Sequence, residues 1–364
     1  MRVMTILGTR PEIIRLSLII AKLDQLAEKH TLVHTGQNFS PSLSGIFFEE
    51  MEVRPPDYTL STGKQTLGAQ LSAIFGEIEQ VLLREKPDVV LLLGDTNSAL
   101  CAIVAERMGI PVLHMEAGNR CYDLKVPEEK NRRIIDAVST INMPYTGYSK
   151  SNLLREGVPA DRIVQTGNPI YEVLNHYMPR IEASGIMDRL GLTAGQYVIV
   201  TAHRAENVDD PVRLRSIIDG LNMVADKSGL RIVCSVHPRT RSKLEGGVAA
   251  HTLHPLVELY EPFGFLDFVK LEKDARLAIT DSGTVQEECC LFGVPTVTIR
   301  DTTERPETVD CGSNVVCGLK PENIAGAAAV MMSLPANWSV PDGYKAEHVS
   351  DIVVKYVLGG KWNV

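Results

Sequence analysis

The sequence lacks the marks of a membrane or secreted protein. Among its 364 residues, no apolar run approaches the roughly 20 residues that a membrane-spanning helix needs. The N-terminal segment MRVMTILGTRPE has neither the long apolar centre nor the small-residue cleavage site of a signal peptide. We therefore expect a cytoplasmic protein with no membrane partner.

Cysteine pairs, positive charge and dinucleotide motifs are also scarce. The seven cysteines are scattered and contain no Cys-x-x-Cys, which argues against a disulfide framework or a zinc site. The formal net charge of −8 argues against a nucleic-acid partner. No Gly-x-Gly-x-x-Gly follows the first apolar run, so NAD is not expected.

What the sequence does contain is a regular alternation of short apolar runs and helical patterns. Such alternation predicts an α/β fold with doubly wound parallel sheets. The length suits two domains of roughly 150–200 residues each, and we expect one Rossmann-like half followed by another. The expected strands are Val3–Leu7, Thr31–His34, Asp88–Leu93, Pro111–His114, Ile141–Tyr145 and Ile163–Thr166, then Tyr197–Thr201, Leu230–Val236, Leu256–Tyr260, Leu277–Thr280 and Thr296–Ile299.

Two acids of the first half stand directly after apolar runs. Asp95 follows the run 89–93, and Glu116 follows the run 110–113. Ligands of open α/β sheets bind outside the carboxyl ends of the strands, so both acids are candidates for a site. Each could instead cap a helix or pair with an arginine. The segment PEEKNRR, which contains Glu128, adds further charge and favours a site.

Two stretches have features of phosphate binding. Gly8-Thr9-Arg10 joins the first expected strand to a helix, where free N–H groups and a guanidinium would attract an anion. In TDSGTVQEE, Ser282 and Gly283 open a helix after another apolar run, and one of the following acids, Glu287 or Glu288, could accept the hydroxyls of a ribose. The simpler interpretation is a serine cap followed by acids that favour the positive helix end.

Two histidines of the second half also follow expected strands. A lone loop histidine is more often structural, but His203 lies among charged residues. His237, followed by Pro238, could contact phosphate or shape a turn. Together the two halves predict a nucleotide diphosphate on the second, with the group attached to it facing the acids of the first.

The motifs GTRPE, GDTNS, HMEAGNR, PEEKNR, TGNP, TAHRAEN, TDSGTVQEE and RDTTERPE occur in an order that resembles the non-hydrolysing UDP-N-acetylglucosamine 2-epimerases over essentially the whole chain. The resemblance implies a GT-B-type architecture with an interdomain nucleotide-sugar cleft. It implies an N-terminal domain of residues 1–168 joined by a C-terminal helix, 346–364, and a UDP-binding domain of residues 169–345. It also implies a homodimer.

The resemblance implies a reaction in which C2 of the sugar loses its proton, UDP departs, and UDP re-adds to a 2-acetamidoglucal with a proton on the other face. Neither a metal nor another cofactor is implied. The residues that match the family's catalytic positions are Asp95, Glu116, Glu128 and His203. The expected substrate contacts are Arg10, Arg15, Arg132, His237, Ser282, Gly283, Glu288, Thr302, Arg305 and Glu307.

The identity of the sugar is left open by two departures from the family. GQNFSPSL, residues 36–43, replaces the usual GQHREML-like segment, and AGNRCYDLKVPEE resembles a subgroup that acts on modified sugars. The expected reaction converts UDP-N-acetylglucosamine to UDP-N-acetylmannosamine. The alternatives are a UDP-2,3-diacetamido-uronic acid or a UDP-6-deoxy-N-acetylhexosamine as substrate, or a GT-B glycosyltransferase.

Overall fold

The computed structural model describes residues 1–37, 41–61, 66–236, 253–360 and 362, without the side chains of residues 41–44 and 205. The chain divides into two compact units. Unit 1 comprises Met1–His176 and Asp342–Val364, and unit 2 comprises Tyr177–Pro341. The division falls within helix α7 (Ile170–Glu182), and each unit is described by itself.

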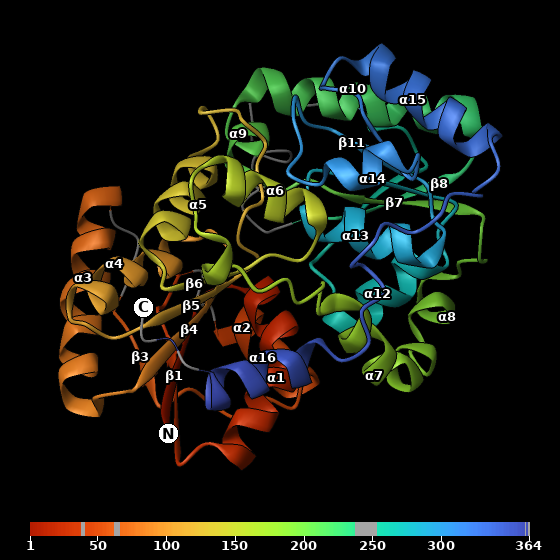
Figure 1. Cartoon of the computed structure of the whole chain (residues 1–364). Coiled ribbons are helices and arrows are strands. Elements are labelled where there is room, and N and C mark those ends of the chain that lie inside the picture. The colour runs from red at the N-terminus through yellow and green to blue at the C-terminus, as the bar shows by residue number, and fades with distance from the viewer. Residues whose placement is uncertain (38–40, 62–65, 237–252, 361, 363–364) are drawn as a thin grey trace. The chain divides into compact units, whose positions relative to one another are not determined.

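Unit 1 is built on a six-stranded parallel sheet of order β3-β2-β1-β4-β5-β6 (Figure 1). All five residues of its strand VVLLL are buried and apolar, as expected of a strand that is covered on both faces. The strands are β1 (Arg2–Leu7), β2 (Lys29–His34), β3 (Tyr58–Thr59), β4 (Val89–Leu93), β5 (Val112–Met115) and β6 (Ile141–Met143).

The helices of unit 1 begin with recognisable sequence signals. Proline occupies the first turn of three of them, α1, α2 and α5, where its missing N–H costs nothing. The helical segments are α1 (Arg10–Leu26), α2 (Pro41–Glu50), α3 (Leu67–Glu85), η1 (Asn97–Leu100), α4 (Cys101–Arg107), α5 (Pro127–Val138), α6 (Gly147–Arg155), η2 (Ala160–Arg162) and α16 (Val349–Gly359). The C-terminal α16 lies beside α1 (Figure 1), and the ammonium of Lys22 donates to the hydroxyl of Ser350 at 2.6 Å.

Unit 2 repeats this plan with the sheet order β12-β11-β10-β7-β8-β9. Its strands are β7 (Tyr197–Thr201), β8 (Arg231–Ser235), β9 (Val257–Tyr260), β10 (Leu277–Thr280), β11 (Thr296–Thr298) and β12 (Asn314–Val316). Its helices are α8 (Ile186–Leu190), α9 (Ala205–Val208), α10 (Pro211–Ser228), α12 (Phe265–Lys273), α13 (Gly283–Phe292), α14 (Pro306–Asp310) and α15 (Pro321–Ser333). Helices α10 and α15 pack closely, since a Cβ at Gly220 would lie 2.8 Å from Ile324 (Figure 1).

The two sheets share one strand order. When the strands of each unit are numbered from its own first strand, both sheets read 3-2-1-4-5-6, the Rossmann arrangement. The predicted fold class of two Rossmann-like halves is therefore confirmed. In this arrangement the strand order reverses between β1 and β4 in unit 1 and between β7 and β10 in unit 2. The predicted interdomain cleft stays a prediction.

The strand predictions were wrong at three places. Strands β3 and β12 were not predicted, because two or three residues give too short an apolar pattern. The expected strand at Ile163–Thr166 is reduced to one bridge between Ile163 and Asn142. Among the residues that the structure describes, no helix combines the length and the apolar character needed to cross a membrane.

Candidate functional site

Each unit gathers charged side chains at the point where its strand order reverses. In unit 1 these are the acids Asp95, Glu116 and Glu128 with the arginines bound to them, which we call the acid set. In unit 2 they follow β7, β10 and β11 and include Arg204, Asp281 and Arg305, which we call the unit 2 set. Reversal points of open parallel sheets are where ligands bind, so each set stands at a favoured position.

Glu116 is held in an unusual backbone conformation directly after β5. Its φ of 66° lies in the left-handed region, which is rare for residues other than glycine and costs about 1–2 kcal/mol. Its carboxylate accepts a hydrogen bond from Arg15 of α1, whose side chain is 2% exposed. Asn119 donates to the other carboxylate oxygen at 3.3 Å. A neighbouring buried guanidinium favours the charged form of a carboxylate, which is the form a general base requires.

Asp95 has a similar arginine partner but more access to solvent. It follows β4 and accepts from Nη2 of Arg132 at 2.6 Å. Arg132 is buried on α5 and also donates to Glu129 at 3.0 Å. The Asp95 side chain is 24% exposed, so its second face can meet a ligand. The structure thus brings the predicted residues Asp95 and Arg132 together.

The two adjacent acids of the PEE motif have different surroundings. Glu129 is fully buried, accepts the backbone N–H of Cys121 at 3.0 Å and pairs with both Arg132 and Arg133. Glu128 lies in the first turn of α5 and is half-buried. Glu129 therefore supports the fold, and Glu128 remains the candidate for chemistry.

The junction of β1 and α1 does not offer the backbone anion site that the sequence predicts. The N–H groups of Gly8 and Thr9 donate to the Glu12 carboxylate at 2.5 and 2.8 Å. Glu12 also accepts from the hydroxyl of Thr96 at 2.7 Å, and its burial raises its pKa to about 7. The chain's own acid thus occupies these donors. Of the predicted phosphate ligands here, the guanidinium of Arg10 remains; it lies 5.4 Å from the Phe47 ring centre.

In unit 2, Asp281 organises the loop after β7. This fully buried carboxylate accepts the backbone N–H groups of His203 and Arg204, each at 3.0 Å, and lies 3.1 Å from Nδ1 of His203. Burial opposes its charge, but His203 and these donors outweigh burial and lower the pKa of Asp281 to about 2. The His203 ring is 49% exposed, so Asp281 orients an imidazole that can still meet a ligand.

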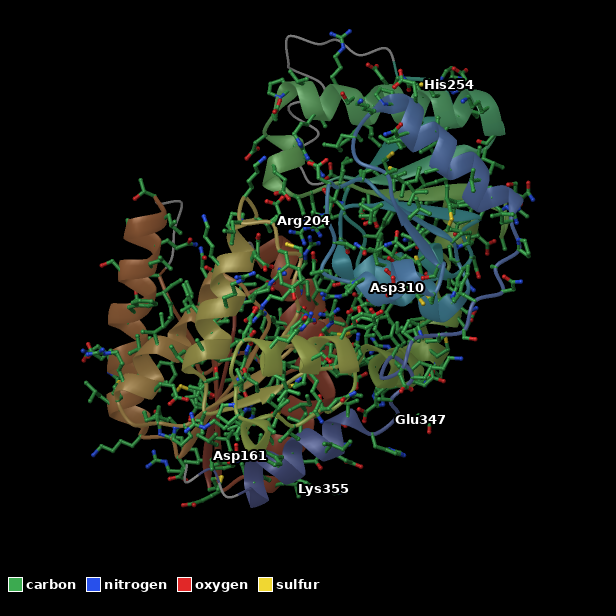
Figure 2. All side chains as sticks on the ribbon, turned by 45° about the horizontal axis from the view of Figure 1, so that its top comes forward. Asp161, Arg204, His254, Asp310, Glu347 and Lys355 are labelled. Carbon is green, nitrogen blue, oxygen red and sulfur yellow. The ribbon has the colours of Figure 1, made fainter. Side chains whose placement is uncertain are left out.

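The N-terminus of α13 lies close to the Glu304 carboxylate and to the loop that carries Arg204. Gly283 opens the helix, and a Cβ there would lie 2.8 Å from the Glu304 carboxylate, so a side chain would not fit. Within the described residues, the hydroxyl of Ser282 does not cap the helix. Arg204, labelled in Figure 2, donates to Glu304 at 3.0 Å. The first backbone N–H groups of α13 therefore lie near the guanidinium of Arg204, in the loop after β7. Helix N–H groups and a guanidinium are both donors that favour an anion.

The acids of α13 also divide their roles. Glu287 accepts a hydrogen bond from Arg305, which ties the RDTTERPE segment to α13. Glu288 is buried beside the carboxyl group of Glu272 from α12. Burial and the Glu288 carboxylate raise the pKa of Glu272 well above its usual range.

The remaining predicted contacts lie at the start of α14 or beyond the described residues. Arg305 and Glu307 are buried there, and Thr302 is half-buried. His237 falls outside the described residues.

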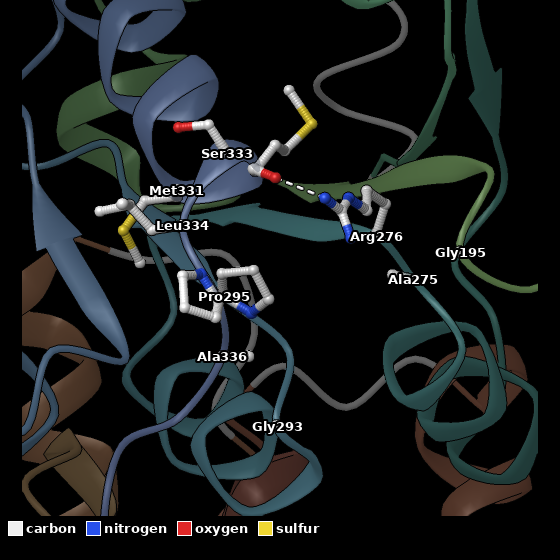
Figure 3. A pocket seen from close by; sticks show the side chains of 11 residues that line it. Gly195, Ala275, Arg276, Gly293, Pro295, Met331, Ser333, Leu334 and Ala336 are labelled. Carbon is white, nitrogen blue, oxygen red and sulfur yellow. Dashed lines mark hydrogen bonds between the residues drawn. The ribbon is translucent and has the colours of Figure 1, made fainter.

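A separate pocket lies at the amino ends of the unit 2 strands, opposite the predicted site. Its lining includes Gly195, Arg276 and Pro295, which precede β7, β10 and β11 (Figure 3). Arg276 donates to the carbonyl of Met332 at its rim. The described lining residues include none of the predicted site residues. Nucleotides bind at the carboxyl ends of parallel strands rather than at the amino ends, so we do not assign the substrate to this pocket.

The sequence reasoning missed several acids that shape the site. Glu12, Asp136, Asp281 and Glu304 are all buried. Asp281 carried a signal, since it directly follows an apolar run inside TDSGTVQEE. Glu12 carried one too, because Thr9 and Glu12 have the spacing of a capping box. Asp136 and Glu304 stand where no spacing indicates a long-range partner.

Taken together, the two Rossmann sheets and the charged sets at their reversal points define a protein of the nucleotide-binding α/β class. Comparison with known proteins narrows this class. A sequence profile described as UDP-N-acetylglucosamine 2-epimerase matches residues 21–357. The chain belongs to the UDP-N-acetylglucosamine 2-epimerase family, a family of isomerases, which confirms the predicted resemblance.

Individual relatives cover nearly the whole chain. A UDP-N-acetylglucosamine 2-epimerase of Methanocaldococcus jannaschii is 40% identical over 94% of this chain and 95% of its own. A UDP-2,3-diacetamido-2,3-dideoxy-D-glucuronate 2-epimerase of Pseudomonas aeruginosa is 38% identical over 90% and 91%. The M. jannaschii UDP-GlcNAc 2-epimerase structure, in complex with UDP-GlcNAc and UDP, is 40% identical, with a TM-score of 0.91 and coverage of 97% and 99%.

Proposed function

We propose that this protein inverts C2 of a UDP-N-acetylhexosamine without hydrolysing it, and that UDP-N-acetylglucosamine is its substrate. The observation that carries the proposal is the acid set, in which Asp95 and Glu116 each hold a buried arginine at the reversal point of unit 1. Two named relatives act on different sugars at nearly equal identity. We favour the unmodified sugar because the two relatives with 40% identity are UDP-N-acetylglucosamine 2-epimerases.

In the proposed reaction, unit 2 binds the UDP portion. The N–H groups of α13 and nearby arginines stabilise the negative charge that grows on the departing diphosphate. Glu288 accepts the hydroxyls of the ribose. His203, oriented by Asp281, assists the leaving phosphate as a donor.

The acid set of unit 1 moves the C2 proton. One carboxylate takes the proton, the C1–O bond to UDP breaks, and a C1–C2 double bond forms. A second acid then delivers a proton to the other face as a UDP oxygen adds back to C1. Glu128 is the third acid available to this exchange. The sequence of events needs no electron acceptor, since carbon is neither oxidised nor reduced overall.

Incubation with UDP-N-acetylglucosamine in D₂O, followed by NMR, tests the proposal. Epimerisation predicts deuterium at C2 and a mixture of two intact UDP-sugars. Free N-acetylmannosamine with UDP would instead indicate a hydrolysing enzyme. Absence of C2 exchange with UDP-N-acetylglucosamine, but exchange with a diacetamido-uronic or 6-deoxy analogue, would move the activity to modified sugars. No exchange with any of them would overturn the epimerase proposal.

We further propose that the protein acts as a homodimer in the cytoplasm. The support is the family resemblance and the lack of a membrane-crossing helix among the described residues. Sedimentation equilibrium gives the assembly directly, and a single species of about 40 kDa would contradict the dimer.

A further inference from the structure

The backbone of Glu116 needs an external support. Its left-handed φ of 66° is followed within two residues by Gly118 at a φ of 80°. A left-handed residue other than glycine persists only when its surroundings hold it. The direction of the Glu116 carboxylate towards Arg15 depends on this turn, so whatever holds the turn also aims the carboxylate.

The support comes from a buried acid on α5. One oxygen of Asp136 accepts Nδ1–H of His114 at 2.9 Å, and the other accepts the backbone N–H of Gly118 at 3.1 Å. The guanidinium of Arg120 lies 2.7 Å from the same second oxygen. These three donors lie on both sides of Glu116 in the chain, so a single carboxylate fixes the turn at both ends.

The same acid also reaches the strand that carries the other catalytic candidate. Nε2 of His114 lies 2.8 Å from the carbonyl of Gly94, the residue before Asp95. A carbonyl only accepts, and so does an ionised carboxylate, so the His114 ring donates from both nitrogens and is an imidazolium. In agreement, the Asp136 carboxylate raises the pKa of His114 despite its burial.

We propose that Asp136 is a positioning residue that aims Glu116, and through His114 supports the Gly94–Asp95 turn. It touches no reacting atom. It acts by holding the left-handed turn of residues 116–118 against relaxation. The expected loss of C2 exchange rests on the proposed function. The expected change in the Glu116 turn does not depend on which reaction the protein catalyses.

The test is Asp136→Asn, which keeps the shape but removes the charge that three donors require. A misplacement near 1 Å costs roughly 100-fold in rate, so we expect kcat for C2 exchange to fall about 100-fold with KM within about threefold. The matched control is Glu156→Gln, which removes the other carboxylate partner of Arg120, at 2.5 Å, and leaves the Glu116 turn untouched. We expect this control to keep kcat within twofold.

A double-variant cycle separates positioning from general damage. If Asp136 acts through Glu116, the substitution Asp136→Asn slows the Glu116→Gln enzyme much less than it slows the wild type, and the remaining loss reflects the Gly94–Asp95 turn. Additive losses, or an equal loss in the Glu156→Gln control, would overturn the proposal. So would an Asp136→Asn enzyme with an unchanged kcat.

A crystal structure of Asp136→Asn distinguishes failure of this inference from failure of the proposed function. We expect φ of Glu116 to leave the left-handed region, or the hydrogen bond from Arg15 to Glu116 to break. An unchanged turn would refute the positioning role even if the reaction is epimerisation. If the turn changes in the variant while the wild type shows no C2 exchange with any of the UDP-sugars, the positioning role is supported. Only the proposed function is then contradicted.

Discussion

The acids at the two reversal points have different partners, although the sheets share one strand order. In unit 2, Asp281 is fully buried and accepts two backbone N–H groups of the loop beside it. In unit 1, Asp95 and Glu116 accept from arginine side chains, and Asp95 is partly exposed. Backbone donors tie the Asp281 carboxylate to its own loop, whereas the side chains of Asp95 and Glu116 are 24% and 10% exposed and can meet a ligand.

The difference suggests a division of labour on one repeated scaffold. The acid of unit 2 gives its bonding capacity to His203 and to the backbone of the loop after β7. In unit 1, Asp95 and Glu116 each have one arginine partner and keep part of their bonding capacity for a ligand. The comparison therefore predicts that removing the charge of Asp95 or Glu116 damages chemistry first, and that removing the charge of Asp281 damages binding and stability first.

The largest expected effect is on C2 exchange in Asp95→Asn and Glu116→Gln. Loss of a general acid or base costs roughly 10²–10⁴-fold in rate, while UDP affinity should change by less than about threefold, because we assign UDP to unit 2. Deuterium incorporation by NMR and UDP titration by calorimetry measure the two quantities. Asp161→Asn, at an exposed position of the same unit, is the control. If both variants lose UDP binding while their fold stays intact, our assignment of UDP binding to unit 2 and proton transfer to unit 1 is wrong.

The next effect is on stability, in Asp281→Asn. Removing one partner of a buried, paired charge costs about 3–5 kcal/mol, and the lost orientation of His203 should weaken UDP binding as well. Because the folded pKa of Asp281, about 2, lies below its ordinary 3.8, its ionic contribution is present above pH 3.8 and lost as pH falls towards 2. Guanidinium unfolding at pH 7 and acid titration check both points.

His203→Gln serves as the control for that experiment. It removes the imidazole but leaves the backbone donors of Asp281 in place, so the loss of stability should be much smaller. Equal losses in the two variants would show that Asp281 does not stabilise the loop through its backbone contacts.

A third comparison concerns Glu12, which is the acid of unit 1 that does resemble Asp281. It too accepts two backbone N–H groups, but burial raises its pKa to about 7 from 4.5. Its contribution to stability is therefore fully present below pH 4.5 and is lost as pH rises through 7. Relative to Glu12→Gln, the free energy of unfolding of the wild type should fall by up to about 3 kcal/mol as the pH rises from 4.5 through 7.

Urea unfolding at pH 4.5 and pH 8 measures that change. Glu79→Gln, an exposed acid on α3, is the control and should show no such pH dependence. A wild-type stability that rises over the same window relative to Glu12→Gln would mean that the three hydrogen bonds to Glu12 outweigh its burial.

The contrast between the units also shows what the sequence can reveal. Strand ends are visible as apolar runs, so Asp95, Glu116, Ser282 and His203 were placed correctly at the carboxyl ends of strands. The partners of these residues were not visible, because Arg15 and Glu116 are 101 positions apart. The β1–α1 junction was misjudged although it carried a local signal: Thr9 and Glu12 have the T-x-x-E spacing of a capping box, in which the acid turns back onto the backbone at the start of the helix.

The smallest expected effect is on the pair of buried acids in unit 2. Glu272 has a pKa raised well above its usual range by burial and by the Glu288 carboxylate, so ionisation of Glu272 destabilises the fold as pH rises. The groups around it are Glu288 and Cys289 of α13, Tyr197 of β7 and Asp274, which follows the end of α12.

Glu272→Gln keeps the shape and removes that ionisation. Its Tm should match the wild type near pH 5 and exceed it by a few degrees at pH 9, in differential scanning calorimetry. Glu322→Gln, an exposed acid on α15, should follow the wild type at both values. If the Tm difference between Glu272→Gln and the wild type instead shrinks as pH rises, Glu272 is already ionised in the folded protein. Our assignment of an uncharged Glu272 beside Glu288 would then be wrong.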